Sequence, residues 1–272
     1  MKKIMAFLCA VLVANSFSLL YARMYESMTI VDVLDYIDLN NPVDCQNTLV
    51  IFDIDNTLAA PAGVLGSDQW FEYMVSKWVQ KGLTVDQAVS AVLPTYLMVH
   101  FRAGLEPIEE CTVAIIHRLQ AAGVRVMCLT TRSFFMAVCA EQQLARIGLR
   151  FALPEVDSME EIIIGATCYP ALYLGGILFC GANTKSSMLK LFFDQIRYQP
   201  GKIIFMDDKH KNIMCLENAF TDSGIEYIGL RYGACDERVK AFNPAHADIL
   251  LTEFMLEQGI QKSQYLTTHA VA

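Results

Sequence analysis

The chain has 272 residues, enough for one large domain or for a core domain with an inserted cap. Hydrophobic residues make up 54% of it and charged residues 18%, a composition that excludes a disordered chain. The net charge is −8 and no cluster of basic residues is present, so we expect no nucleic-acid partner, because phosphate contacts need Lys and Arg.

The first 22 residues have the pattern of a secretory signal peptide. Lys2 and Lys3 form a positive start, residues 4–13 are apolar, and small residues follow as far as Ala22. An uncleaved membrane anchor is the alternative, but polar residues from Asn15 onward interrupt the apolar stretch. No later segment has 18 uninterrupted apolar residues. We therefore expect an exported protein with no stable membrane insertion after cleavage.

Apolar spacing and turn residues predict helices and strands along the rest of the chain. The first half is expected to contain a helix over 28–40, a buried strand over 47–55, a helix from Ser67 to Gly82, a helix over 83–101 that is broken or kinked near Pro94, and a helix over 108–123. The second half is expected to contain a strand over 124–131, a helix over 132–148, a β-hairpin over 171–181, a helix over 184–196, a strand over 202–208, a helix over 211–220, a strand over 226–232 and a helix over 245–259.

This alternation predicts an α/β fold, a doubly wound Rossmann-like parallel sheet flanked by helices, with a mainly helical inserted cap and a small β-hairpin insertion. The helical stretch at 60–110 is expected to be the cap, because it lies between two core strands without adding one. The core is then predicted to comprise residues 23–59 and 111–272, after a signal peptide at 1–22.

Polar motifs follow several of the predicted strands. The four are FDIDNT at 52–57, LTTRS at 129–133, NTKSSML at 183–189 and FMDDKHKN at 205–212. In doubly wound sheets, ligands gather beyond the carboxyl ends of the strands. In order and type, the four motifs resemble those of the haloacid dehalogenase-like hydrolase superfamily over about residues 47–232.

Within that superfamily, the chain most resembles the DUF2608 family of exported bacterial proteins. The shared features are the signal peptide, the FDIDNTL strand, YLGGILFCGANTK before the lysine of the third motif, and GLRYGACDERVKAFNP near the end. The resemblance supplies no substrate. Exported acid phosphatases of the superfamily also combine a secretory signal with a DxDxT core and a small cap.

The resemblance assigns Asp53 as nucleophile and Asp55 as general acid and base. A carboxylate at Asp53 can attack phosphorus and form an aspartyl-phosphate. Asp55 is expected to point to the same face, because strand side chains alternate. There it can protonate the leaving oxygen and later deprotonate the attacking water.

A divalent cation is expected, because the carboxylates repel one another and the phosphate is also anionic. By resemblance, the ligands of Mg²⁺ are Asp53, the backbone carbonyl of Asp55 and one aspartate of DDKHKN. We favour Asp208 as the direct ligand, with Asp207 and Asn212 supporting it. The choice between Asp207 and Asp208 stays open.

The resemblance places Thr130 and Lys185 on the substrate phosphate, with Thr131 and Lys190 as rival choices. Lys185 would neutralise transition-state charge. Arg132 is a further candidate for binding the phosphate, although a surface salt bridge is an equally open interpretation.

The predicted function is an exported Mg²⁺-dependent phosphomonoesterase, periplasmic or secreted from a bacterium, that acts on a small phosphorylated metabolite. A non-catalytic binding or host-interaction protein on the same fold and a phosphotransferase are the alternatives.

Overall fold

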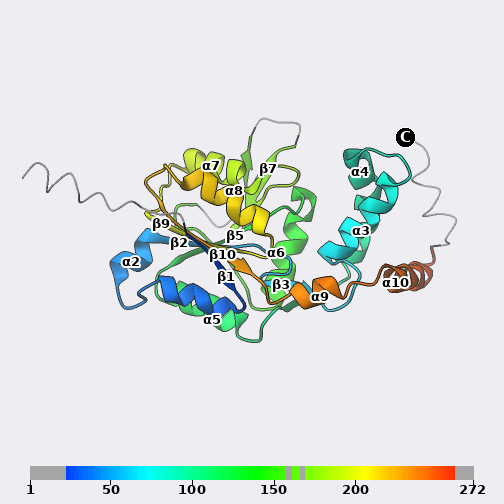
Figure 1. The fold of residues 1–272 in the computed structure, drawn as a ribbon, viewed down its shortest axis with the longest axis horizontal. Helices are drawn as coiled ribbons and strands as arrows, with labels where there is room; N and C mark the ends of the chain where they lie inside the picture. Colours follow the sequence, from blue (N-terminus) through cyan, green and yellow to red (C-terminus); the bar gives the residue numbers. More distant parts are fainter. Residues whose placement is uncertain (1–22, 157–160, 166–168, 261–272) are drawn as a thin grey trace, which may run out of the picture.

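The computed structural model describes residues 23–156, 161–165 and 169–260 (Figure 1). The predicted signal peptide lies outside these residues. In the described part of the chain, no helix has both the length and the apolar character that a membrane span requires.

An eight-stranded sheet forms the centre of the molecule (Figure 1). Its six parallel strands come first and its two antiparallel strands lie at one edge. In spatial order the strands are β1 (Arg23–Ser27), β10 (Glu226–Tyr232), β9 (Lys202–Asp207), β2 (Thr48–Phe52), β5 (Arg125–Thr130), β8 (Ile177–Phe179), β7 (Ala171–Leu174) and β6 (Ile162–Ile164). The mixed α/β fold with a mostly parallel sheet is therefore confirmed.

Helices cover both faces of this sheet (Figure 1). One face carries η1 (Ile30–Tyr36), α5 (Thr112–Ala121) and α6 (Ala137–Arg146), and the other carries α7 (Lys185–Ile196) and α8 (His210–Phe220). The remaining described helices are α2 (Pro42–Asn47), η2 (Phe134–Met136), α9 (Asp236–Lys240) and α10 (Pro244–Glu257), besides two in the inserted region.

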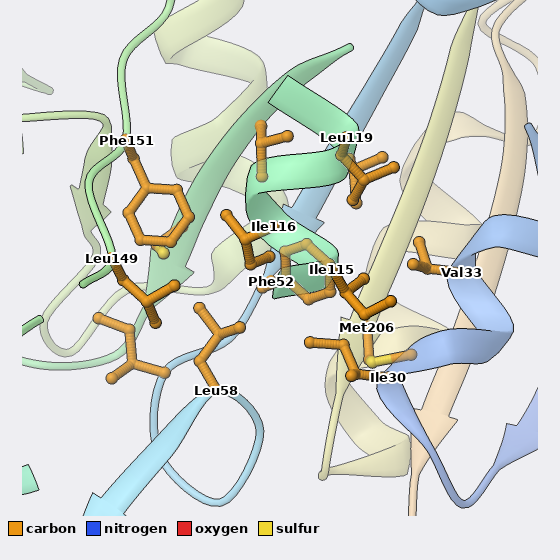
Figure 2. Packing of buried hydrophobic residues seen from close by; sticks show 14 of the residues in the cluster. Ile30, Val33, Phe52, Leu58, Ile115, Ile116, Leu119, Leu149, Phe151 and Met206 are labelled. Carbon is orange, nitrogen blue, oxygen red and sulfur yellow. The ribbon is translucent and has the colours of Figure 1, made fainter. Parts of the chain in front are cut away.

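Alternate residues of the central strands build two separate apolar layers. In β2, Val50 and Phe52 join the layer that includes α5, whereas Leu49 and Ile51 join the layer under α7 and α8. Figure 2 shows the first layer, in which Phe52 lies beside Ile115 and Ile116 of α5, and Ile30 and Val33 of η1 belong to the same cluster. Because both faces are buried, the strand is apolar throughout, as the sequence predicted.

The region predicted as a cap consists of β3 (Ala59–Pro61), α3 (Asp68–Val79), α4 (Val85–His100) and β4 (Leu105–Pro107). β3 and β4 pair with each other as a two-stranded antiparallel sheet and add nothing to the central one. α3 and α4 pack together with α10 in a third apolar cluster. The exact division into core and cap stays a prediction.

Two expectations about individual elements need correction. Within residues 28–40, only Ile30–Tyr36 is helical, and it is a short 3₁₀-helix that ends where Ile37 takes an extended conformation. α4 runs without interruption through Pro94, because the packing of its apolar face outweighs one missing hydrogen bond. The hairpin predicted at 171–181 is present as β7 and β8, and β8 also pairs with β5, so that the hairpin extends the central sheet.

Candidate active site

Three adjacent parallel strands end at the same edge of the sheet. Phe52 of β2 is paired with Met206 of β9 on one side and with Cys128 of β5 on the other. The next residue, Asp53, donates its backbone N–H to the carbonyl of Met206 at 2.9 Å. Since the chain continues from β2 to β5 on one side and returns to β9 on the other, these ends form the crevice where doubly wound sheets bind ligands.

The two aspartates of FDIDNT both line one pocket, but strand alternation is not the cause. β2 ends at Phe52, and the chain turns immediately afterwards. The carbonyl oxygen of Ile54 accepts backbone N–H groups from residues 57–59 at 3.0–3.3 Å, which closes a tight loop. This loop, and not a continued strand, presents Asp53 and Asp55 to the same pocket.

Lys185 joins two of the predicted site carboxylates. It begins α7, where Thr184 caps the helix, and its side chain is 1% exposed. Its Nζ lies 2.7 Å from Asp53 Oδ1 and 2.6 Å from Asp207 Oδ2. Burial raises the pKa of the Asp53 carboxyl well above its usual range, although the Lys185 charge opposes this shift. The rival Lys190 lies over the ring of Phe220 instead.

Asp207 and Asp208 have different surroundings. Asp207 accepts hydrogen bonds from Lys185, from the backbone of Lys209 at 2.8 Å and from Asn212 Nδ2 at 2.9 Å. Asp208 Oδ1 is buried and makes no hydrogen bond within the described residues. Burial, together with the charge of Asp207, raises the pKa of Asp208 to about 7.

The carboxylates of Asp53, Asp207 and Asp208 form a compact cluster. One oxygen from each lies within 4.8 Å of the other two. Three carboxylates at this spacing repel one another unless a cation lies between them, and hard cations such as Mg²⁺ prefer such oxygen ligands. The unpartnered Oδ1 of Asp208 leaves one oxygen free for that purpose.

Asp55 is held by Arg132. The guanidinium donates two hydrogen bonds of 2.8 Å to its carboxylate, and the two side chains are 3% and 15% exposed. Burial alone would raise the pKa of Asp55, but the charge and hydrogen bonds of Arg132 outweigh it, so that the pKa lies below its usual range. Arg132 thus makes a buried ion pair, and its predicted contact with phosphate stays a prediction.

Thr130 and Thr131 take different places at the end of β5. Thr130 is buried, and its Oγ1 accepts the backbone N–H of Arg132 at 3.1 Å. Thr131 is exposed and lines the pocket. In this conformation the threonine that lines the pocket is Thr131, the alternative to Thr130.

A pocket of about 360 Å³ is lined by three of the predicted site residues, Asp53, Asp55 and Lys185. Sequence reasoning did not single out Asp68, Lys209 and Lys211, which also line it. Lys209 directly follows the aspartate pair, and that position was the available signal. The full lining is Asp53, Asp55, Asp68, Thr131, Gly181, Ala182, Asn183, Thr184, Lys185, Lys209, Lys211, Asn212 and Cys215.

Asn56 and Thr57 connect the two aspartate loops. Thr57 Oγ1 accepts the backbone N–H of Asp208 at 3.1 Å. Asn56, which has a left-handed φ of 57°, donates from Nδ2 to Asp208 Oδ2 at 3.4 Å. The loop after β2 and the loop after β9 are therefore positioned by each other.

Comparisons with known proteins extend over most of the chain. A family model described as "Protein of unknown function (DUF2608)" matches residues 26–262. The chain is 26% identical over 223 residues to a "Putative outer membrane protein" of Chlamydia muridarum, 81% of each chain. A Chlamydia trachomatis protein of the same name is 25% identical over 235 residues, 84% of this chain and 82% of the relative.

Among solved structures, the chain is similar to a haloacid dehalogenase-like family hydrolase from Streptococcus pneumoniae. The TM-score is 0.38 with 13% identity, over 67% of this chain and 93% of the other. A likeness of this size is loose.

Proposed function

The chain belongs to the DUF2608 family, and we propose that it acts as an exported Mg²⁺-dependent phosphomonoesterase on a small phosphorylated metabolite. The observation that carries this proposal is the cluster of Asp53, Asp207 and Asp208 beside the buried ammonium of Lys185. Asp53, a nucleophilic carboxylate, and Lys185, a positive charge for phosphoryl oxygens, line one pocket, and the further cation ligands Asp207 and Asp208 lie within 4.8 Å of Asp53.

The residues present fit a bound Mg²⁺. Asp53 and Asp208 would hold it with the backbone carbonyl of Asp55, and Asp207 would support them through Lys185 and Asn212. When bound, the ion supplies charge neutralisation between the carboxylates and the phosphoryl oxygens. The free oxygen of Asp208 supports its choice as direct ligand.

In the proposed reaction, an Asp53 carboxylate oxygen attacks phosphorus while the bond from phosphorus to the ester oxygen breaks. The leaving alcohol takes a proton from Asp55. Water then attacks the aspartyl-phosphate and gives its proton to Asp55, and the bond between phosphorus and Asp53 breaks to release inorganic phosphate. Lys185 offsets negative charge on the phosphoryl group in both steps.

The ion pair with Arg132 bears on the two roles of Asp55. It keeps the carboxylate ionised, the form that accepts a proton from water. To protonate the leaving oxygen, Asp55 must first be protonated and turn away from Arg132. We therefore propose that substrate binding separates this pair.

Export is supported by two observations. The first 22 residues have the signal-peptide pattern, and the chlamydial relatives carry an outer-membrane name. We propose a periplasmic or secreted location for the mature chain.

The test is hydrolysis of p-nitrophenyl phosphate and a panel of phosphomonoesters, with and without EDTA. We expect activity that EDTA removes, that Mg²⁺ restores and that Asp53→Asn abolishes. No such activity in the wild-type chain would contradict the proposal. Tight binding of a phosphorylated ligand that survives Asp53→Asn would indicate a binding protein, and transfer to an added alcohol would indicate a phosphotransferase.

A further inference from the structure

Lys209 links the aspartate loop to the inserted helices. It follows Asp208 directly, and its Nζ lies 2.6 Å from Asp68 Oδ2 and 2.8 Å from Glu72 Oε1. Both carboxylates belong to the N-terminal part of α3. The Lys209 and Asp68 side chains are only 29% and 25% exposed, so solvent screens this pair less than it would screen an open surface pair.

A second connection lies beside the first. Gln69 of α3 donates from Nε2 to Asn56 Oδ1 at 3.2 Å, and Asn56 in turn bonds to Asp208. The start of α3 is therefore tied to both loops that carry the site carboxylates. Farther along the same helix, Lys77 is paired with Asp248 of α10 at 2.9 Å.

The first turn of α3, which contacts Lys209 and Asn56, borders the pocket. Asp68 and Lys209 both belong to its lining, so a ligand that extends beyond the carboxylates meets this pair on one side. Lys77 and Asp248 are not part of that lining. The two ion pairs of α3 thus anchor one helix, but only one of them lies beside the site.

We propose that Lys209 is a positioning residue that holds the first turn of α3 beside the pocket and thereby limits the size of the leaving group. The size limit rests on the proposed phosphatase function, whereas the anchoring of α3 does not. Small phosphomonoesters fit within the anchored pocket, and bulky ones require that the turn move away.

The kinetic test compares kcat/KM for p-nitrophenyl phosphate with kcat/KM for a phosphotyrosine decapeptide. In Lys209→Met and in Asp68→Asn, we expect the ratio to shift about tenfold toward the peptide. If Lys209 acted only through its charge on the substrate, the two variants would move kcat/KM in opposite directions, and the proposal would be wrong.

Lys77→Met is the matched control. It removes an ion pair of the same helix away from the pocket, so the substrate ratio should stay at the wild-type value. If Lys77→Met shifted the substrate ratio as much as Lys209→Met, any loosening of α3 would change the ratio. The proposed positioning role of Lys209 would then be wrong.

Amide hydrogen exchange gives a readout that needs no catalysis. We expect faster exchange over residues 70–74 in Lys209→Met than in the wild type or in Lys77→Met. Unchanged exchange would contradict the anchoring, and faster exchange with an unchanged substrate ratio would contradict the size limit. If the wild-type chain hydrolyses no phosphomonoester, the proposed function fails, while the exchange data still decide the anchoring.

Discussion

At the scale of residues, the buried pair of Arg132 and Asp55 gives a direct stability prediction. Arg132→Met leaves the Asp55 carboxylate without the partner that holds it ionised. Breaking a buried ion pair on one side costs about 3–5 kcal/mol, and we expect a loss of this size in the free energy of unfolding. Urea denaturation at pH 7 measures it.

The double variant Arg132→Met with Asp55→Asn serves as the control. It carries neither charge, so it should recover part of the lost free energy of unfolding. Equal stability of the single and double variants would show that the unpaired charge of Asp55 is not what destabilises Arg132→Met.

Bound Mg²⁺ should stabilise the folded chain, because the cluster of Asp53, Asp207 and Asp208 exists only when the strand ends are aligned. At a concentration of about 100 times Kd, the gain in unfolding free energy is about 2.7 kcal/mol. A thermal melt with and without EDTA measures it as a change in Tm. Asp208→Asn should remove most of the gain, and a Tm that does not respond to Mg²⁺ would contradict the predicted metal site.

Sequence reasoning identified the carboxylates and the lysine that lie together at the strand ends. It could do so because the order of the motifs and the ends of the apolar runs can be read directly from the sequence. It did not identify the partner of Arg132, nor the contact between Lys209 and Asp68. Those contacts depend on side-chain rotamers and on where an inserted helix lies, and neither follows from a motif pattern.

At the scale of elements, the turn between β7 and β8 depends on two glycines. Gly175 and Gly176 have φ of 56° and 74°, as a tight hairpin turn with two left-handed residues requires. An alanine Cβ at Gly176 would lie 2.4 Å from the backbone of Phe151, whereas at Gly175 it would meet only the flexible side chain of Glu141 at 3.1 Å.

We expect Gly175→Ala to cost about 1–2 kcal/mol of unfolding free energy, from the left-handed conformation alone. Gly176→Ala should cost about 1–3 kcal/mol more, because of overlap with the neighbouring backbone. Equilibrium unfolding of the two variants compares them directly. Equal losses would mean that the neighbouring segment moves aside.

His100, the last residue of α4, gives a pH prediction. It is fully buried and stacks on Tyr96, with ring centroids 5.4 Å apart. Burial lowers the pKa of His100 from 6.5 to about 4. Between these values the unfolded chain binds the proton more readily, so stability decreases as the pH falls from 6.5 toward 4.

The measurement is the difference in unfolding free energy between the wild type and His100→Phe, which keeps an aromatic ring. This difference should shift against the wild type by about 2 kcal/mol between pH 7 and pH 5. The carboxylates common to both chains cancel in the subtraction. A difference independent of pH would mean that His100 titrates normally in the folded chain.

Elements with strong local signals were predicted well. Ser67 caps α3, and the continuous apolar runs became β2, β5 and β9. The edge strands β1 and β6 were not predicted. β1 is five residues long and depends on pairing with the distant strand β10, which short sequence patterns do not reveal. β6 pairs with the neighbouring β7, but it is only three residues long, too short for an alternating pattern to show.

At the scale of the whole molecule, three apolar clusters divide the chain. Two lie on the faces of the central sheet, and the third comprises side chains of α3, α4 and α10 with Met136. The alternation of strands and helices predicted the doubly wound sheet, but it could not show that α10 would leave the sheet and pack on the inserted helices. That contact joins segments more than 140 residues apart. Each apolar helix face involved would pack equally well against other apolar surfaces, so the sequence does not identify its partner.

This division predicts that the sheet domain folds without the inserted helices. Pro61 of β3 is paired with Leu105 of β4, so an Asn-Gly turn can replace residues 62–104 and close the two strands as a hairpin. The chain must also end at residue 243, because α10 would otherwise expose Ala247, Leu251 and Met255. Both sheet-face clusters then stay complete.

We expect this shortened chain to unfold in one cooperative transition, followed by far-UV circular dichroism, since its two sheet-face clusters remain buried. A chain that keeps α3 and α4 but ends at residue 243 is the control. It should aggregate, because the apolar faces around Trp70 and Tyr96 lose their cover. If the shortened chain shows no cooperative transition, the inserted helices are required for the sheet to fold, and residues 60–110 are not an independent cap.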